Sequence, residues 1–156
     1  MDKGSSKSLY LPSLASRLID DERLGMLSEF DVLKAEIIQN ISLILNSRIR
    51  PERAALRDDP VLYRSVLGFG IKDFCGTTQS NEIVEDIIEE IRDQIITFEP
   101  RLDPKTVKVK QITTNIQVSS VGFEISGKMN VKPYNEDISY AFRFDLELGG
   151  PVQRLN

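Results

Sequence analysis

Apolar residues recur at intervals of three and four along the chain as far as Phe98, a spacing that places them on one face of a helix. A short, separately packed first helix is expected around residues 11–18, before a charged break at residues 20–25. A longer helix is expected from Asp31, which can cap it, to Leu45. Its apolar face would consist of Leu33, Ile37, Ile41, Ile44 and Leu45.

Start and stop signals frame two further helices. Asp59 followed by Pro60 is typical of a helix start, and Gly68 and Gly70 end the short helix that this pair opens. A second long helix is expected to begin near Ser80. Its apolar face would consist of Val84, Ile87, Ile88, Ile91, Ile95 and Phe98.

Beyond residue 104 the apolar period changes to two, which is typical of strands. The expected strands span residues 107–118, 123–131 and 138–148. A break is expected near residues 111–113, and Ser119 with Ser120 marks a turn. The last strand alternates apolar and polar residues strictly, so one of its faces should be buried and the other solvated or partnered.

Helices followed by strands predict an α+β fold, with N-terminal helices packed on one face of a small antiparallel sheet formed by the C-terminal half. The chain has 156 residues, which suits one domain. We expect that domain at residues 9–148, with flexible ends at residues 1–8 and 149–156. Gly149, Gly150 and Pro151 would release the second of these ends.

The charge balance and the rare residue types narrow the function. A net charge of −4 gives no general attraction to nucleic acid or to an anionic membrane surface. Histidine is absent, which removes the commonest general base and transition-metal ligand, so no cofactor or metal is expected. Cys75 alone cannot form an internal disulfide, and no apolar run is long enough to cross a bilayer, so we expect a cytoplasmic protein without membrane insertion.

The most distinctive short segment is Glu99-Pro100-Arg101, an acid, a rigid proline and a base between the last helix and the first strand. It could be a simple helix stop, with Glu99 solvated and Arg101 near the negative end of the helix dipole. Without other information this interpretation is favoured. The alternative is a surface hinge that presents Arg101 as a planar fork to a partner's carboxylate or carbonyls, held in place by Glu99. The physics of the segment alone does not choose between the two.

Three other groups favour structural roles. In Gly68-Phe69-Gly70, Asp73 stands where a phosphate-binding loop needs its third glycine, so these glycines should end a helix and form a turn. Cys75 has no histidine to activate it and is expected to be a buried or half-buried filler. An acidic helix face is expected to be solvated, with a patch for a basic partner as the second choice; it consists of Glu82, Asp86, Glu89 and Asp93.

A glycoside hydrolase is the alternative that an enzyme function would require. Glu99 is the best candidate for its general acid, with Asp103 or Asp59 as the second carboxyl. Arg101, however, should stabilise the ionised form of Glu99, which is opposite to what a general acid needs. The sequence also lacks the tryptophans on which sugars often stack.

Five segments in order resemble the TssE family of type VI secretion baseplate subunits and the related wedge proteins of contractile phage tails. They are Leu14-Ala15-Ser16-Arg17-Leu18, Leu45-Asn46-Ser47-Arg48, Ser65 to Asp73, Phe98-Glu99-Pro100-Arg101-Leu102, and the strand-rich end. The resemblance covers roughly residues 9–152. Two departures are Asn46-Ser47-Arg48 in place of Asn-Thr-Arg, and Gly68-Phe69-Gly70 in place of Asn-Tyr-Gly, which loses a phenolic hydroxyl.

The resemblance implies a non-enzymatic subunit of a baseplate docked at the inner membrane. It would dock through Glu99, Pro100 and Arg101 on the wedge core of TssF and TssG, and its sheet would template the first ring of the sheath subunits TssB and TssC. Other baseplate and tube components are further possible partners. The same resemblance leaves open the equivalent protein of a phage tail and, because the family has been labelled lysozyme-like, a peptidoglycan hydrolase.

Overall fold

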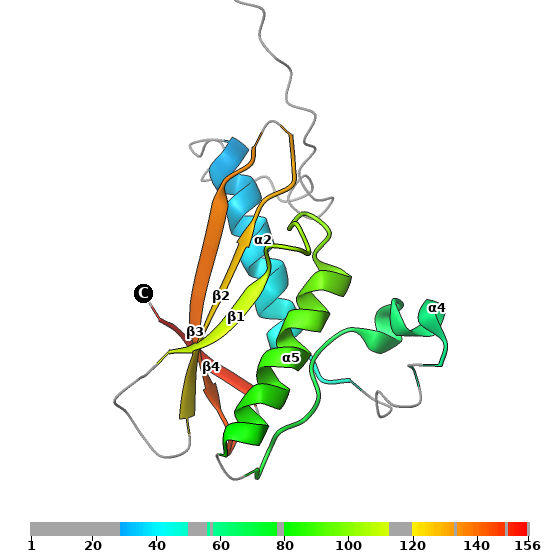
Figure 1. The fold of residues 1–156 in the computed structure, drawn as a ribbon, viewed down its shortest axis with the longest axis vertical. Helices are drawn as coiled ribbons and strands as arrows, with labels where there is room; N and C mark the ends of the chain where they lie inside the picture. The colour runs from blue at the N-terminus through cyan, green and yellow to red at the C-terminus, as the bar shows by residue number, and fades with distance from the viewer. Residues whose placement is uncertain are drawn as a thin grey trace, which may run out of the picture.

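The computed structural model describes residues 29–49, 56, 58–77, 80–112, 120–132, 134–148 and 150–155 (Figure 1). The helices in this part of the chain are α2 (Glu29–Asn46), α4 (Pro60–Tyr63), the 3-10 helix η2 (Val66–Gly68) and α5 (Asn81–Phe98). The strands are β1 (Lys108–Ile112), β2 (Ser120–Lys128), β3 (Asp137–Asp145) and β4 (Gly150–Leu155). The first helix expected from the sequence, at residues 11–18, lies outside the described residues.

The long helices form where their apolar stripes and caps predict them. In α5 the Ser80 hydroxyl accepts a hydrogen bond from the Ile83 backbone N–H, and the helix ends directly before Glu99. The Asp59 carboxylate caps α4 in the same way, with Pro60 as the first helical residue. The expected apolar face of α2 is fully buried.

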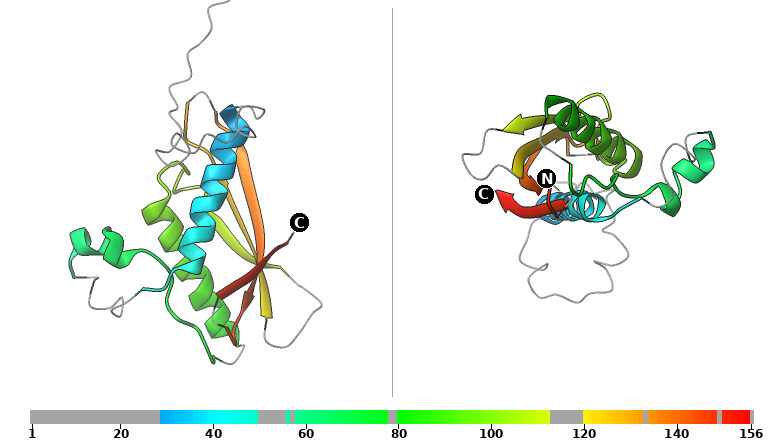
Figure 2. Two further views of the ribbon diagram at one scale, coloured as in Figure 1. Left: turned by 180° about the vertical axis from the view of Figure 1, so that it is seen from behind. Right: turned by 90° about the horizontal axis from the view of Figure 1, so that it is seen from below.

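The strands form one antiparallel sheet in the order β1-β2-β3-β4. Buried residues alternate along β3 and along β2 from Phe123 onward, and Phe123 lies directly opposite Phe142 with the two rings stacked. α5 packs along β1 and α2 packs against α5 and β4, so the two long helices lie side by side on one face of the sheet (Figure 2). This arrangement confirms the predicted α+β class.

Two expectations about the sheet are wrong. The tail expected from residue 149 is instead β4, which pairs with β3 from Asp145↔Gly150 to Ala141↔Leu155. The backbone groups of β3 would otherwise form an open edge, and Pro151 is tolerated because β4 is itself an edge strand. Ser120, expected in a turn, begins β2 opposite Asp145; Ser119 lies outside the described residues.

The ends of two strands also differ from the expectation. β3 ends at Asp145, whose carboxylate accepts hydrogen bonds from the backbone N–H groups of Glu147 and Leu148 and so closes a turn. Leu148 is therefore 73% exposed instead of continuing the buried face. β1 keeps a regular register through Ile112, so no break occurs at residues 111–112, and residues 113–118 lie outside the described part.

In the part of the chain that the structure describes, neither of the long helices is apolar enough to pass through a bilayer.

Candidate functional site

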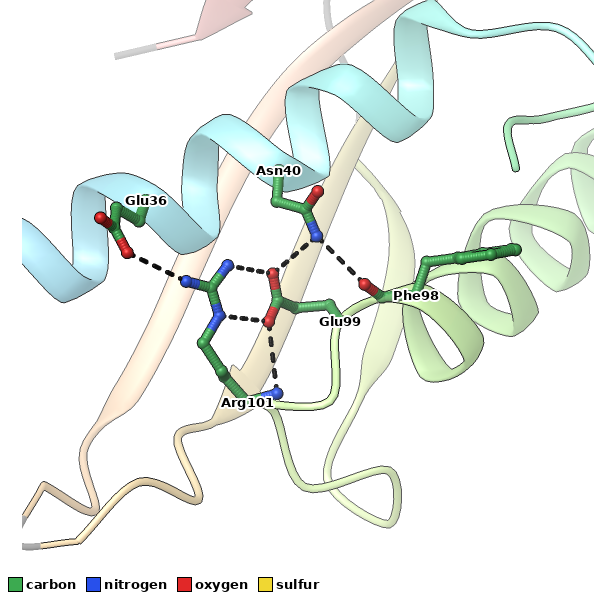
Figure 3. Close-up of polar contacts among 5 residues, drawn as sticks. All are labelled: Glu36, Asn40, Phe98, Glu99 and Arg101. Carbon is green, nitrogen blue, oxygen red and sulfur yellow. Dashed lines mark hydrogen bonds and ion pairs between the residues drawn. The ribbon is translucent and has the colours of Figure 1, made fainter. Parts of the chain in front are cut away.

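The Glu99-Pro100-Arg101 segment forms a corner where the chain leaves α5. The Glu99 backbone N–H still donates to the Ile95 carbonyl at 2.9 Å, as in a helix, and the Leu102 N–H then donates to the Glu99 carbonyl at 3.2 Å. Pro100 lies exposed at the turn itself. The helix therefore stops at a tight turn from which the side chains of Glu99 and Arg101 point towards α2 (Figure 3).

The Arg101 guanidinium binds the Glu99 carboxylate through two parallel hydrogen bonds. Its Nε donates to Glu99 Oε1 and its Nη2 to Glu99 Oε2, both at 2.7 Å, and its backbone N–H donates to Oε1 at 3.2 Å. Short, paired bonds of this kind are the strongest that arginine and a carboxylate make. Glu99 and Arg101 thus hold the corner together by binding each other.

Two residues of α2 complete the cluster. Glu36 Oε2 lies 3.2 Å from Arg101 Nη1, and Asn40 Nδ2 donates to Glu99 Oε2 at 2.9 Å and to the Phe98 carbonyl at 3.1 Å (Figure 3). Asn40 thereby satisfies one of the carbonyls that the end of α5 leaves without a helical partner. The cluster ties α2 to the end of α5, and we call these four residues, Glu36, Asn40, Glu99 and Arg101, the corner cluster.

The expectation that Glu99 lies at the surface is wrong. Glu99 is 1% exposed, because its carboxylate is enclosed by the donors of Arg101 and Asn40, whereas Arg101 retains 25% of its side-chain exposure. The guanidinium of Arg101 also forms hydrogen bonds within the chain, to Glu99 and Glu36. It is therefore not held open for a partner's carboxylate, as the surface-hinge interpretation expected. What the corner offers to the outside is Pro100 and the exposed part of Arg101.

Glu36 and Asn40 were missed from the sequence, although a signal existed. They are four residues apart and so lie on the same side of α2, directly beside the buried stripe of Leu33, Ile37 and Ile41. Polar residues that border a buried stripe in this way can face a polar group on a neighbouring helix. Their partners, Glu99 and Arg101, lie about 60 residues further along the chain, so the sequence of α2 alone does not identify them.

A second polar anchor joins the glycine loop to α5. The buried Gln94 side chain accepts a hydrogen bond from the Gly70 N–H and donates one to the Gly68 carbonyl, each at 3.0 Å. Gly70 has a φ of +111°, and Gly68 ends η2, so these glycines do act as helix-ending and turn residues. Phe69 packs edge-on against Phe98 with ring centroids 5.2 Å apart.

The same loop contacts the end of α2. The Ile71 N–H donates to the Ser47 carbonyl and the Ile49 N–H donates to the Ile71 carbonyl, which makes a short parallel bridge. Arg48 Nη1 donates to the carbonyls of Leu45 and Ser47, and burial lowers the pKa of its guanidinium while the carboxylate of Asp73 opposes that shift. Three of the segments singled out in the sequence, around residues 46–48, 68–71 and 98–101, therefore meet in space.

The remaining candidates have structural contacts. Asp59 caps α4, and the Asp103 carboxylate accepts the Lys105 N–H at 3.0 Å, so both possible partners of Glu99 in a hydrolase hold backbone groups. Cys75, expected to be buried or half-buried, is exposed, with its Sγ 2.9 Å from the Glu147 carbonyl. Among the described residues no group of three His, Cys, Asp or Glu side chains is arranged to hold a metal ion.

Comparison with known proteins yields one match. A family model described as baseplate wedge protein gp25 matches residues 31–134, which is more than half of the chain and includes all but the first two residues of α2, all of α5, the corner cluster, β1 and β2. No curated protein and no solved structure matches the chain significantly.

Proposed function

Because the chain belongs to the family of baseplate wedge protein gp25, we propose that it is a structural subunit of a type VI secretion baseplate. In this proposal it docks through Glu99, Pro100 and Arg101 on the wedge core built by TssF and TssG. The baseplate as a whole would lie at the inner membrane. The family membership carries the structural baseplate role. The finer partners come from the resemblance to the TssE family, and the corner cluster and the sheet offer surfaces that could bind them.

The corner cluster supports docking because it is rigid before any partner arrives. Glu99 fixes the guanidinium of Arg101 at two nitrogens and Glu36 fixes it at a third. Side chains that are already ordered lose little conformational entropy when they enter an interface, so their contacts contribute more fully to affinity. Pro100 adds an exposed, stiff apolar surface beside the exposed part of Arg101.

The sheet supports a role as the template for TssB and TssC. β1 and β4 are its two edge strands, and an edge strand carries backbone donors and acceptors that another chain's strand can pair with. Templating would place a sheath strand beside one of these edges.

The proposal includes the absence of catalysis. All the hydrogen bonds described at the Glu99 carboxylate come from donors on Arg101 and Asn40, so both of its oxygens are engaged within the chain. Purified chain should therefore leave peptidoglycan intact, and its degradation in a way that Glu99→Gln stops would favour a hydrolase.

Co-purification with TssF and TssG tests the docking. The Arg101→Ala chain should lose most of its binding to the two partners, whereas Lys105→Ala, which removes an exposed cation four residues away, should bind as the unmodified chain does. Circular dichroism would verify that both variants are folded. Full binding by folded Arg101→Ala would remove the corner from the interface.

The same experiment with phage wedge subunits addresses the equivalent protein of a phage tail. Capsid genes beside the gene for this chain would indicate that setting, and sheath genes beside those for TssF and TssG would indicate secretion. A chain that bound only phage wedge subunits would overturn the secretion assignment while keeping the wedge role.

A further inference from the structure

α4 and η2 form an arm, residues 59–69, that stands away from the rest of the molecule beside α5 (Figures 1 and 2). No residue of α4 is buried. Four large apolar side chains of the arm are instead in contact with solvent, with exposed fractions of 79% for Val61, 42% for Leu62, 89% for Val66 and 51% for Leu67. Apolar side chains gathered in this way on a surface are typical of sites that another protein covers.

Specific contacts hold the arm in this position. The Asp59 carboxylate caps α4, and the Ser65 hydroxyl accepts the Leu67 N–H at the start of η2. Gly68 passes so close to α4 that a Cβ there would lie 1.9 Å from the Tyr63 carbonyl oxygen. Together with the Gln94 anchor at its base, these contacts make the exposure of the apolar side chains a fixed feature of the fold.

An acidic stripe of α5 begins where the arm meets the helix. The Tyr63 hydroxyl donates to the Asp93 carboxylate. From Asp93 the stripe continues towards the start of α5 at intervals of three and four residues, which keeps its members on one side of the helix. Its members are Asp93, Glu89, Asp86 and Glu82, all exposed.

We propose that the arm and the acidic stripe together bind an amphipathic, basic helix of another protein. The apolar side of that helix would cover the four exposed side chains of the arm, and its Lys or Arg residues would face the stripe. Charge complementarity of this kind selects the partner and speeds its approach. The residues involved are different from Glu99, Pro100 and Arg101, so this is a second interface beyond the proposed docking corner.

The charges also argue against the other ways of covering the arm. A second copy of the chain would bring two acidic stripes and two net charges of −4 together. A nucleic acid or an anionic membrane would meet the same repulsion. A basic protein helix is the partner that suits both the apolar and the charged part.

Binding of synthetic helical peptides to the full chain tests the proposal. The probe has a leucine face bordered by lysines, and a second peptide has the same leucines bordered by glutamates. Fluorescence anisotropy should show that the lysine peptide binds roughly tenfold or more tightly than the glutamate peptide, and that added salt reduces the difference. Equal binding of the two peptides would overturn the proposal.

Matched variants locate the binding site. Val61→Ser with Val66→Ser should weaken binding of the lysine peptide roughly tenfold or more, because each change removes exposed apolar surface that the peptide would bury. Leu148→Ser, which removes an apolar side chain that is 73% exposed elsewhere on the molecule, should leave the binding unchanged. Asp86→Lys with Glu89→Lys should also weaken it, and Glu136→Lys with Glu147→Lys should not.

Two results would contradict the proposal directly. One is unchanged peptide binding by the Val61 and Val66 double variant. The other is self-association of the unmodified chain in sedimentation experiments that this double variant abolishes, because it would assign the arm to a second copy. Loss of TssF and TssG binding in Arg101→Ala with normal peptide binding would separate the two interfaces.

Discussion

Glu99 is a buried carboxylate whose position depends on two other side chains. A carboxylate without partners is costly to bury, and the bidentate contact with Arg101 together with the Asn40 amide offsets that cost. The residue thus serves first to brace the end of α5 against α2. Any docking role of the corner rests on this internal bracing.

Replacement of Glu99 by alanine should therefore destabilise the isolated chain. The change leaves the Arg101 guanidinium and the Asn40 amide without their shared acceptor, and the free energy of unfolding should fall by roughly 2–3 kcal/mol, moderated by the partial exposure of Arg101. Urea unfolding measures this loss. Glu99→Gln, which keeps one acceptor oxygen, should lose less; unfolding of Glu99→Ala at the same urea concentration as the unmodified chain would show that the bracing contributes nothing.

The sequence predicts where the helix stops at Glu99 but not that this residue is buried. The stop is local, since Pro100 restricts the residue before it. The burial comes from α2, whose Asn40 contacts Glu99 across 59 positions of the chain. Contacts at such a distance in sequence cannot be inferred from a single chain's pattern.

At the scale of elements, the loop between η2 and α5 depends on close backbone approach to the end of α2. Both Gly70 and Gly76 have positive φ angles, +111° and +74°, but only at Gly70 would a Cβ meet another segment. A Cβ at Gly70 would lie 2.7 Å from the carbonyl carbon and oxygen of Ser47, whereas a Cβ at Gly76 would have no atom within 4 Å. Substitutions at the two glycines therefore separate the free-energy cost of the backbone angle from the cost of the steric contact with Ser47.

Gly70→Ala should destabilise the chain more than Gly76→Ala. The backbone angle alone should cost about 1 kcal/mol at Gly76, and at Gly70 the clash with Ser47 should bring the loss to roughly 2 kcal/mol or more. Thermal unfolding of the two variants gives the comparison. Equal losses would mean that the loop moves away from α2 without penalty.

Elements with strong local signals were predicted well, and β4 was not. α5 has a serine cap, a long apolar stripe and a proline after its end, so its limits follow from the sequence within a residue. Gly149, Gly150 and Pro151 are typical of a loop, and β4 forms only because β3 offers it an edge. Its pairing also includes a register shift between Arg143 and Phe144, which no local pattern indicates.

At the scale of the whole molecule, β4 brings this side of the sheet into contact with α2. It also makes β4, and not β3, the edge of the sheet. Any partner strand that joins this side must pair with residues 150–155. The corner cluster lies instead between α2 and the end of α5, so the two regions can be separated by truncation.

A chain that ends at Leu148 should keep its wedge partners and lose the sheath. Removal of β4 takes away the edge strand but leaves the corner cluster in place, so co-purification with TssF and TssG should persist while recruitment of TssB and TssC falls. Retained recruitment of the sheath subunits would contradict pairing through β4 and would leave β1 or the newly open edge of β3 as the template.

Hydroxyl-radical footprinting of the chain, alone and bound to the purified TssF and TssG core, reports side-chain exposure without any substitution. Docking through the corner predicts a several-fold fall in the labelling of Pro100 and Arg101 on binding, with Leu148, which is 73% exposed, labelled equally in both states. Unchanged labelling of Pro100 and Arg101 in the complex would contradict docking through this corner.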